Sequence, residues 1–171
     1  MMRIGFVGVC LVFFVGCTTQ KTEKPMPEWN QKKSTDLNRE LMTEQEIDIK
    51  LFLAQHEAWK VEETGTGLRY VVGKETDGPI PQPGQSAKVH YKISLLNGKV
   101  CYKTAPDELD VFVVDNSEME SGIHEGIKKM RLGEKAKLSF PSHLAHGLVG
   151  DMKEIPPLSP LVVDIELITI E

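Results

Sequence analysis

The chain has 171 residues, a formal net charge of −5 and only 6% aromatic residues. This length is enough for one well-buried domain. An acidic chain with few aromatic residues argues against nucleic acid as a partner and against electrostatic attachment to anionic lipid.

Residues 1–16 have the features of a secretory signal, with Arg3 followed by an apolar stretch over 4–16. The stretch is short for a membrane span, since a spanning helix needs about 20 apolar residues. The sequence Phe-Val-Gly-Cys at 14–17 is similar to a bacterial lipobox, in which Cys17 is lipidated and becomes the mature N-terminus. We therefore expect a lipoprotein signal peptide over 1–16, and the alternative is an uncleaved anchor helix.

Cleavage before Cys17 leads us to expect a protein anchored in the cell envelope and facing the periplasm. Several acyl chains on Cys17 would supply the membrane contact, because one chain alone anchors only marginally. Cys10 leaves with the signal and Cys17 carries lipid, so Cys101 is expected to be the one free thiol, without an intramolecular disulfide. We expect a monomer.

A polar segment over 17–42 begins at the lipidated Cys17 and precedes the first predicted helix. It has no apolar periodicity, so we expect a flexible tether. Thr43 and Glu46 have the spacing of a capping box and favour a helix over 43–60. This helix is expected to pack on its own domain, with a dimerisation helix as the alternative. Its predicted apolar face consists of Ile47, Leu51 and Ala54.

From residue 61 onward the sequence has β character. Strands are predicted from apolar runs or alternation at 67–72, 88–95, 99–102, 111–114 and 136–140, and from 161 to the end. Asn97-Gly98 predicts a hairpin, because both residues tolerate the positive φ of a type I′ turn. In the last strand the apolar phase changes at Ile168, which indicates a bulge or burial on both faces.

A short helix is predicted after residue 117. Ser117 and Glu120 have capping-box spacing. Gly122 and Gly126 lie one turn apart, and because glycine costs helix stability we expect a close approach to the sheet as compensation. The apolar stripe of this helix consists of Ile123, Ile127 and Met130. Together these elements predict an α+β domain over 61–171, a half-open antiparallel sheet wrapped around one short helix, with an additional N-terminal helix.

Short motifs over 67–171 are shared with a known family. They are Val89-His90-Tyr91, Asn97-Gly98-Lys99, Glu125-Gly126, Ala136-Lys137-Leu138, Ile155-Pro156-Pro157 and Leu161-Val162. In these motifs the chain resembles the FKBP-type peptidyl-prolyl isomerases. With the lipobox and Ser-Glu-Met-Glu-Ser-Gly at 117–122, it is most similar to the FKBP-type lipoproteins associated with gliding motility in Bacteroidetes.

The resemblance implies catalysed rotation about X-Pro bonds in exported, proline-containing polypeptides, without a cofactor or metal. Amide rotation has a barrier of about 18–20 kcal/mol, while the cis and trans X-Pro states differ by only ~0.5–1 kcal/mol. The enzyme must therefore bind the twisted amide better than either planar form. An apolar cup with few hydrogen-bond donors meets that need. A non-catalytic binding or chaperone module in an envelope assembly is the second hypothesis.

The resemblance also implies the pocket. The catalytic positions would be Tyr91, Phe112, Glu120, Ile123, His146, Ile155 and Val163, and Cys101, Tyr102 and Met119 would complete the substrate pocket. A gap-free match would put Asp110 at the position of Phe112. Tyr91 could equally be a plain core residue of its strand.

Several of these residues differ from the family pattern. Cys101 and Val163 stand where the family has Phe, and Ile123 stands where it has Trp. Tyr102 replaces an Asp that orients the pocket, and His146 replaces a Tyr whose hydroxyl donates to the ligand. We therefore expect a shallower and less aromatic cup, and these replacements motivate the binding-module hypothesis.

Three charged or reactive groups have competing interpretations. His143 and His146 are spaced like a metal pair, but zinc sites need three or four ligands. Glu118 and Glu120 resemble paired carboxylates, although acids are favoured at a helix start by its dipole. Cys101 as a nucleophile has no evident base and fits a buried sheet position.

Overall fold

The structure is a computed structural model that describes residues 30–171. The predicted signal peptide, the lipidation site Cys17 and the first part of the predicted tether lie outside these residues. The elements are α1 (Gln31–Ala54), β1 (Val61–Glu63), β2 (Arg69–Lys74), β3 (Ser86–Leu95), β4 (Val100–Lys103), β5 (Asp110–Val113), α2 (Ser121–Ile127), β6 (Lys135–Phe140), the 3-10 helix η1 (Ser142–Leu144) and β7 (Leu161–Ile170).

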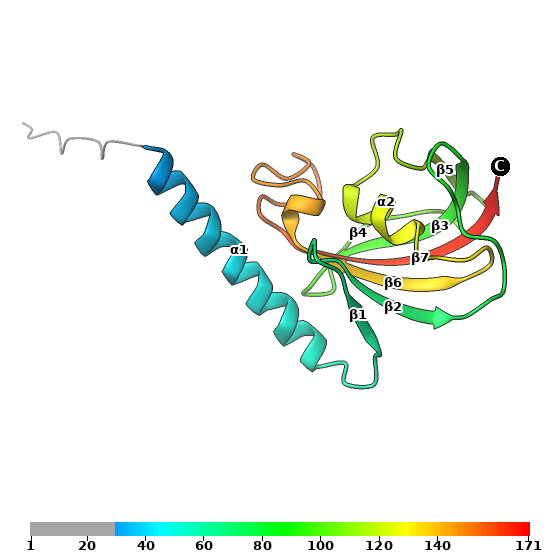
Figure 1. The fold of residues 1–171 in the computed structure, drawn as a ribbon, viewed down its shortest axis with the longest axis horizontal. Coiled ribbons are helices and arrows are strands. Elements are labelled where there is room, and N and C mark those ends of the chain that lie inside the picture. The colour runs from blue at the N-terminus through cyan, green and yellow to red at the C-terminus, as the bar shows by residue number, and fades with distance from the viewer. Residues whose placement is uncertain (1–29) are drawn as a thin grey trace, which may run out of the picture.

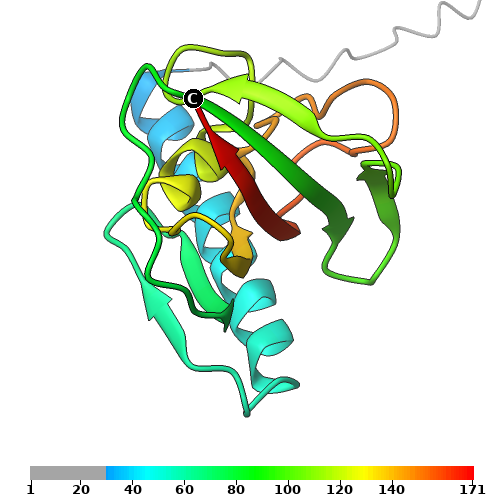
Figure 2. The same ribbon diagram turned by 90° about the vertical axis from the view of Figure 1, so that its right-hand side faces the viewer.

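A seven-stranded sheet, antiparallel at every pairing, carries the fold (Figure 1). Its order is β1-β2-β6-β7-β3-β4, and β5 pairs with β3 beside this path. The sheet curves around α2, while α1 runs past the end of the domain at which η1 lies (Figures 1 and 2). The predicted α+β class, a half-open sheet around one short helix with an extra N-terminal helix, is confirmed.

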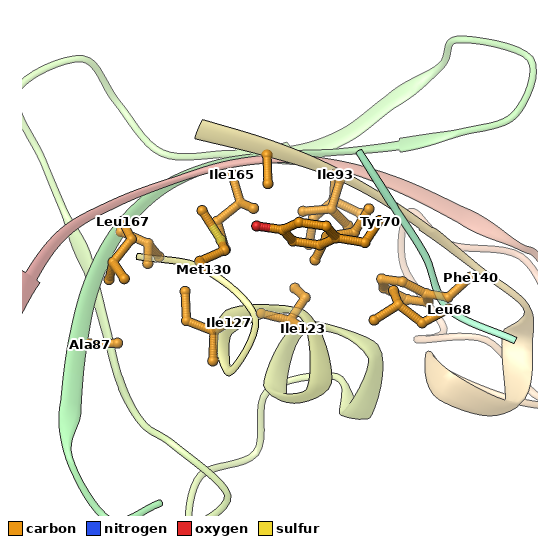
Figure 3. Close-up of a cluster of buried hydrophobic side chains, with 14 of the residues drawn as sticks. Leu68, Tyr70, Ala87, Ile93, Ile123, Ile127, Met130, Phe140, Ile165 and Leu167 are labelled. Atoms are coloured by element: carbon orange, nitrogen blue, oxygen red, sulfur yellow. The ribbon is translucent and has the colours of Figure 1, made fainter. Parts of the chain in front are cut away.

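The contact between α2 and β6 depends on two glycines. A Cβ on Gly122 would lie 2.6 Å from the Phe140 ring, and one on Gly126 would lie 2.5 Å from Leu138 Cδ1. The predicted stripe of Ile123, Ile127 and Met130 is fully buried against the sheet, as Figure 3 shows. The prediction that the glycines permit a close approach is confirmed, and this approach sets the position of the N-terminus of α2.

Helix α1 starts earlier than the sequence analysis predicted. Asn30 caps it, with its Oδ1 accepting a hydrogen bond from the Lys33 backbone N–H at 3.0 Å. Thr43, the predicted cap, lies within the helix and donates its hydroxyl to the Arg39 carbonyl at 2.8 Å. The predicted tether is therefore wrong over residues 31–42, and the helix ends at Ala54 rather than near 60. Polar composition alone does not separate a solvated helix from a flexible segment.

The face of α1 that contacts the β domain also differs from the prediction. Ile47 and Leu51 are more than half exposed, whereas Gln45 and Ile49 are buried. Gln45 Oε1 accepts the Ser142 backbone N–H at 2.8 Å, and Arg69 donates to the carboxylate of Glu46. The C-terminal half of α1 packs on its own domain as expected, through these polar contacts and Ile49. None of the helices in residues 30–171 is long and apolar enough to cross a bilayer.

The β3–β4 hairpin forms as predicted, but with another turn. Of the two turn residues only Gly98 has a positive φ, of 86°. The Gly98 N–H donates to the Leu95 carbonyl at 2.9 Å, and Leu95 N–H donates to the Lys99 carbonyl at 2.9 Å. This is a three-residue loop closed by a left-handed glycine rather than a type I′ turn. The predicted bulge in the last strand is confirmed, because the β3–β7 register skips Ile168.

The capping box predicted at the start of α2 does not form. The Ser117 hydroxyl donates to the Val113 carbonyl at 3.1 Å, and Glu120 is the N-cap without a side-chain cap bond. The helix begins only at Ser121. The Glu120 carboxylate is thus directed away from the helix backbone and toward His146.

Candidate active site

A hollow of about 340 Å³ opens beside the N-terminus of α2. Strands β3 and β4 form one wall, the segment before α2 forms a second, and the loop between η1 and β7 forms the third. Its lining residues are Tyr91, Ile93, Tyr102, Glu118, Met119, Glu120, His146, Asp151 and Lys153. Five of these, Tyr91, Tyr102, Met119, Glu120 and His146, are among the ten predicted pocket residues.

The other predicted residues lie around and beneath this hollow. Ile123 and Val163 are 0% exposed, Ile155 is 2% exposed and Phe112 is 4% exposed, and all four belong to the hydrophobic core. The Phe112 ring meets His124 edge-on, with ring centroids 5.4 Å apart. Cys101 is half-buried and its Sγ lies 3.6 Å from the Glu154 carbonyl. These side chains support the walls, and their predicted direct roles stay predictions.

Tyr91 forms the aromatic part of the hollow. Burial and the nearby Asp110 carboxylate raise the pKa of its hydroxyl to about 12, so the phenol is neutral at physiological pH. Asp110, the alternative to Phe112 in the sequence analysis, thus acts on the Tyr91 hydroxyl while Phe112 packs in the core. Tyr91 is half-buried, which fits a wall residue better than a plain core residue.

Tyr102 and Asp151 form a contact across the mouth of the hollow. The Tyr102 hydroxyl donates to the Asp151 carboxylate, which also accepts the backbone N–H groups of Lys153 and Ile155, each at 2.8 Å. Burial alone would raise the pKa of Asp151, but these three donors outweigh it and hold the pKa at about 2. The hydrogen bond to Asp151 also raises the pKa of Tyr102 to about 12.

Asp151 was not found from the sequence. The resemblance implied only that Tyr102 replaces an Asp, whereas the structure brings a carboxylate to the Tyr102 hydroxyl from another loop. The one local signal is Gly150, whose φ is +68° and whose hydrogen faces the backbone of Ile155 so closely that a Cβ could not fit. A glycine of that kind indicates a tight turn, and the polar residue after it becomes a candidate wall residue.

Glu120 and His146 join the second and third walls. Glu120 Oε1 lies 3.1 Å from His146 Nε2, and the Glu120 side chain is only 10% exposed. His143, by contrast, places its Nε2 3.1 Å from the Thr66 carbonyl outside the hollow. The two histidines therefore have separate partners. Within residues 30–171 no group of three His, Cys, Asp or Glu side chains is arranged to hold a metal.

Cys101 does not have the surroundings of an activated thiol. Burial raises the pKa of its Sγ, which keeps the group in the less nucleophilic thiol form. Its neighbouring backbone carbonyls at Lys99 and Glu154 offer no base. The chemistry available at the hollow is thus binding and orientation, on an apolar surface with polar side chains around it.

A larger hollow of about 810 Å³ lies over the outer face of the sheet, between Trp59 and the loop after β4. Its floor is charged. Asp164 is paired with Lys92 at 2.6 Å and also with Lys137, and Lys137 Nζ lies 5.1 Å from the Trp59 ring centroid. Burial, with Lys92 nearby, lowers the pKa of Lys137. Ion pairs across its floor make this hollow a poor receptor for a proline ring.

A curved antiparallel sheet around one short helix, with an apolar hollow at the start of that helix, defines an FKBP-like fold. Residues 78–168 match the family model of the FKBP-type peptidyl-prolyl cis-trans isomerases. The chain belongs to this family of isomerases.

Individual relatives agree with that assignment. A peptidyl-prolyl cis-trans isomerase of Schizosaccharomyces pombe is 35% identical over 104 residues, which are 60% of this chain and 92% of the relative. Peptidyl-prolyl cis-trans isomerase FKBP1A of Xenopus laevis is 35% identical over 108 residues, 61% of this chain and 99% of the relative.

Solved structures show the same similarity. A peptidyl-prolyl cis-trans isomerase of Pseudomonas syringae superposes with a TM-score of 0.64 at 28% identity, covering 74% of this chain and 92% of that one. FkpA from Escherichia coli superposes with a TM-score of 0.63 at 28% identity, over 82% of this chain and 67% of that one.

Proposed function

We propose that this FKBP-type isomerase acts on exported polypeptides from a membrane anchor at Cys17, facing the periplasm. The signal-like residues 1–16 and the lipobox support the location. A link to gliding motility is part of the proposal and is supported by the sequence resemblance at 117–122. The substrates are X-Pro segments of unfolded or flexible chains.

The observation that carries the catalytic part is the hollow, where Tyr91, Ile93 and Met119 offer apolar surface between polar walls. A twisted amide carries less charge on its oxygen than a planar one, so an apolar surface disfavours it less than water does. Selective binding of the twisted form lowers the barrier to rotation. His146 Nε2 is engaged with Glu120, so this pair forms part of the wall and the apolar side chains carry the binding of the proline ring.

The test of catalysis measures cis–trans exchange of X-Pro tetrapeptides by NMR with the purified full chain in detergent. We expect exchange faster than the uncatalysed rate, which corresponds to tens of seconds or more at 25 °C. Exchange at the uncatalysed rate for several X residues would contradict catalysis.

That negative outcome would favour the binding module. The observation behind this second candidate is that both polar pairs of the hollow, Glu120 with His146 and Tyr102 with Asp151, are already satisfied within the chain. A binding module would retain affinity for proline-containing peptides in calorimetry without accelerating their isomerisation.

The location has its own test. In a bacterial host given an alkyne-labelled fatty acid, the wild-type chain should incorporate the label and fractionate with membranes. Cys17→Ala should abolish both, whereas Cys101→Ala, which removes a thiol outside the lipobox, should abolish neither. A labelled Cys17→Ala variant would contradict the anchor.

A further inference from the structure

The walls of the hollow carry more negative than positive charge. Glu118, Glu120 and Asp151 line it with three carboxylates, against the one ammonium of Lys153. His146, which is hydrogen-bonded to Glu120, is the one imidazole in this lining. The chain is acidic overall, and here the negative excess surrounds the apolar surface of Tyr91, Ile93 and Met119.

None of the three carboxylates forms an ion pair with Lys or Arg within the described residues 30–171, although the pKa of Lys99, raised mainly by its hydrogen bond to Glu154, is also raised by the nearby Asp151 charge. Asp151 accepts hydrogen bonds only from the Tyr102 hydroxyl and two backbone N–H groups. Glu118 has no hydrogen-bond or ion-pair partner within the same part of the chain. Glu120 is paired with His146 alone. Their negative potential is therefore available to a bound ligand.

Burial increases the effect of this charge. This holds for Glu120, whose side chain is 10% exposed and whose charge is therefore screened less than that of the exposed Glu118. Cavities lined by one sign of charge concentrate the opposite sign inside them. The positive charge of the Lys153 ammonium opposes this effect, because it repels a cationic substrate.

We propose that this isomerase prefers prolines with a basic side chain, Lys or Arg, next to them. The proline ring occupies the apolar floor at Tyr91, Ile93 and Met119, and the neighbouring cation lies against the carboxylates. The specificity residues are Glu118, Glu120 and Asp151. This inference rests on the isomerase function proposed for the same hollow.

The test compares tetrapeptides that differ only in the residue before or after proline, namely Lys, Gln or Glu. NMR exchange gives kcat/KM without a coupled protease that has its own charge preference. At low ionic strength we expect Lys to exceed Gln by roughly fivefold and Gln to exceed Glu by a similar factor, as an order-of-magnitude effect of the net charge. The differences should shrink in about 0.5 M NaCl, where screening is strong.

Two variants identify the groups responsible. Glu118→Gln should lower the Lys-to-Glu ratio about threefold, and Lys153→Gln should raise it by a similar factor. Glu44→Gln, an exposed change of the same chemistry on α1, should leave the ratio unaltered. A ratio that moves equally in Glu118→Gln and Glu44→Gln would overturn the assignment to the hollow.

The outcomes separate the two proposals. Accelerated exchange that is equal for the Lys, Gln and Glu peptides overturns the charge preference and leaves the isomerase function standing. Exchange at the uncatalysed rate for all three peptides overturns both. A preference for Glu over Lys would show that Lys153, not the carboxylates, dominates recognition.

Discussion

Glu120 Oε1 and His146 Nε2, 3.1 Å apart, connect the N-terminus of α2 to the loop between η1 and β7. The two residues are 26 positions apart in the sequence. This contact closes one side of the hollow. It holds the loop that contributes Asp151 in its position beside β3 and β4. The position of the loop therefore depends on Glu120, whose side chain makes no capping hydrogen bond to α2.

Removing this contact should loosen the loop. Glu120→Ala is expected to speed amide hydrogen exchange at residues 145–152 and to cost about 1 kcal/mol of unfolding free energy, the usual net value of one hydrogen bond. Hydrogen exchange followed by mass spectrometry, with a urea titration, measures both. The control is Glu118→Ala, since Glu118 has no hydrogen-bond or ion-pair partner among residues 30–171. Equal exchange in the two variants would show that the pair does not hold the loop.

Tyr91 should matter more for activity than a histidine outside the hollow. Tyr91→Ala removes the aromatic wall, and we expect a loss of roughly tenfold or more in kcat/KM, about 1.4 kcal/mol of transition-state binding. His143→Ala should leave kcat/KM unaltered, because His143 faces Thr66. Tyr91→Phe keeps the ring and should keep most of the activity. A folding check by circular dichroism on both variants separates loss of the wall from loss of the fold. Equal losses in Tyr91→Ala and His143→Ala would remove the pocket assignment.

The sequence predicted the strands and the helix around this site better than the side-chain contacts within it. Period-two alternation at 88–95 and the glycines of α2 lead directly to β3 and to the close helix–sheet contact. The start and buried face of α1 were missed, because Ile47 and Leu51 are apolar yet exposed while Gln45 is buried by its hydrogen bond to Ser142. Apolar patterns identify buried surface only where packing is apolar.

Asp151 shows a second limit. Its partner Tyr102 is 49 positions away in the sequence, and no local pattern encodes their contact. The loop conformation that joins them depends on backbone hydrogen bonds to the same carboxylate from Lys153 and Ile155. Contacts between irregular loops can be found only in the three-dimensional structure, whereas contacts within strands and helices can be predicted from sequence periodicity.

Arg69 is expected to hold α1 on the β domain. Its side chain is 1% exposed and donates to Glu46 of α1 and, at 3.0 Å, to Glu63 of β1. Arg69→Ala should destabilise the protein by roughly 2 kcal/mol, because a buried side chain and its charge-assisted hydrogen bonds are lost, while Glu46 and Glu63 keep part of their contact with water. Lys50→Ala, which removes a more exposed partner of Glu46, should cost much less. Urea titrations of the two variants measure the difference.

The same contact predicts a pH dependence. The hydrogen bond from Arg69 lowers the pKa of Glu46 below its ordinary value of 4.5. A depressed pKa in the folded state stabilises the protein above the unfolded value, and this contribution is lost as pH falls through the folded value. The stability difference between wild type and Glu46→Gln should therefore be constant near neutral pH and shrink below about pH 4.5. A difference that persists unchanged at pH 3 would contradict the role of the charge.

The approach of α2 to the sheet should not tolerate a methyl group at Gly126. A Cβ there would lie 2.5 Å from Leu138 Cδ1 and 2.8 Å from Cδ2, so Gly126→Ala must displace the helix or the buried leucine. Overpacking of this kind costs about 1–3 kcal/mol and outweighs the gain in helix propensity of about 1 kcal/mol. Gly65→Ala is the matched control, because no atom lies within 4 Å of its added Cβ. Thermal unfolding should show a lower Tm for Gly126→Ala only, and because the helix carries Glu120 at its start, its isomerase activity should fall as well.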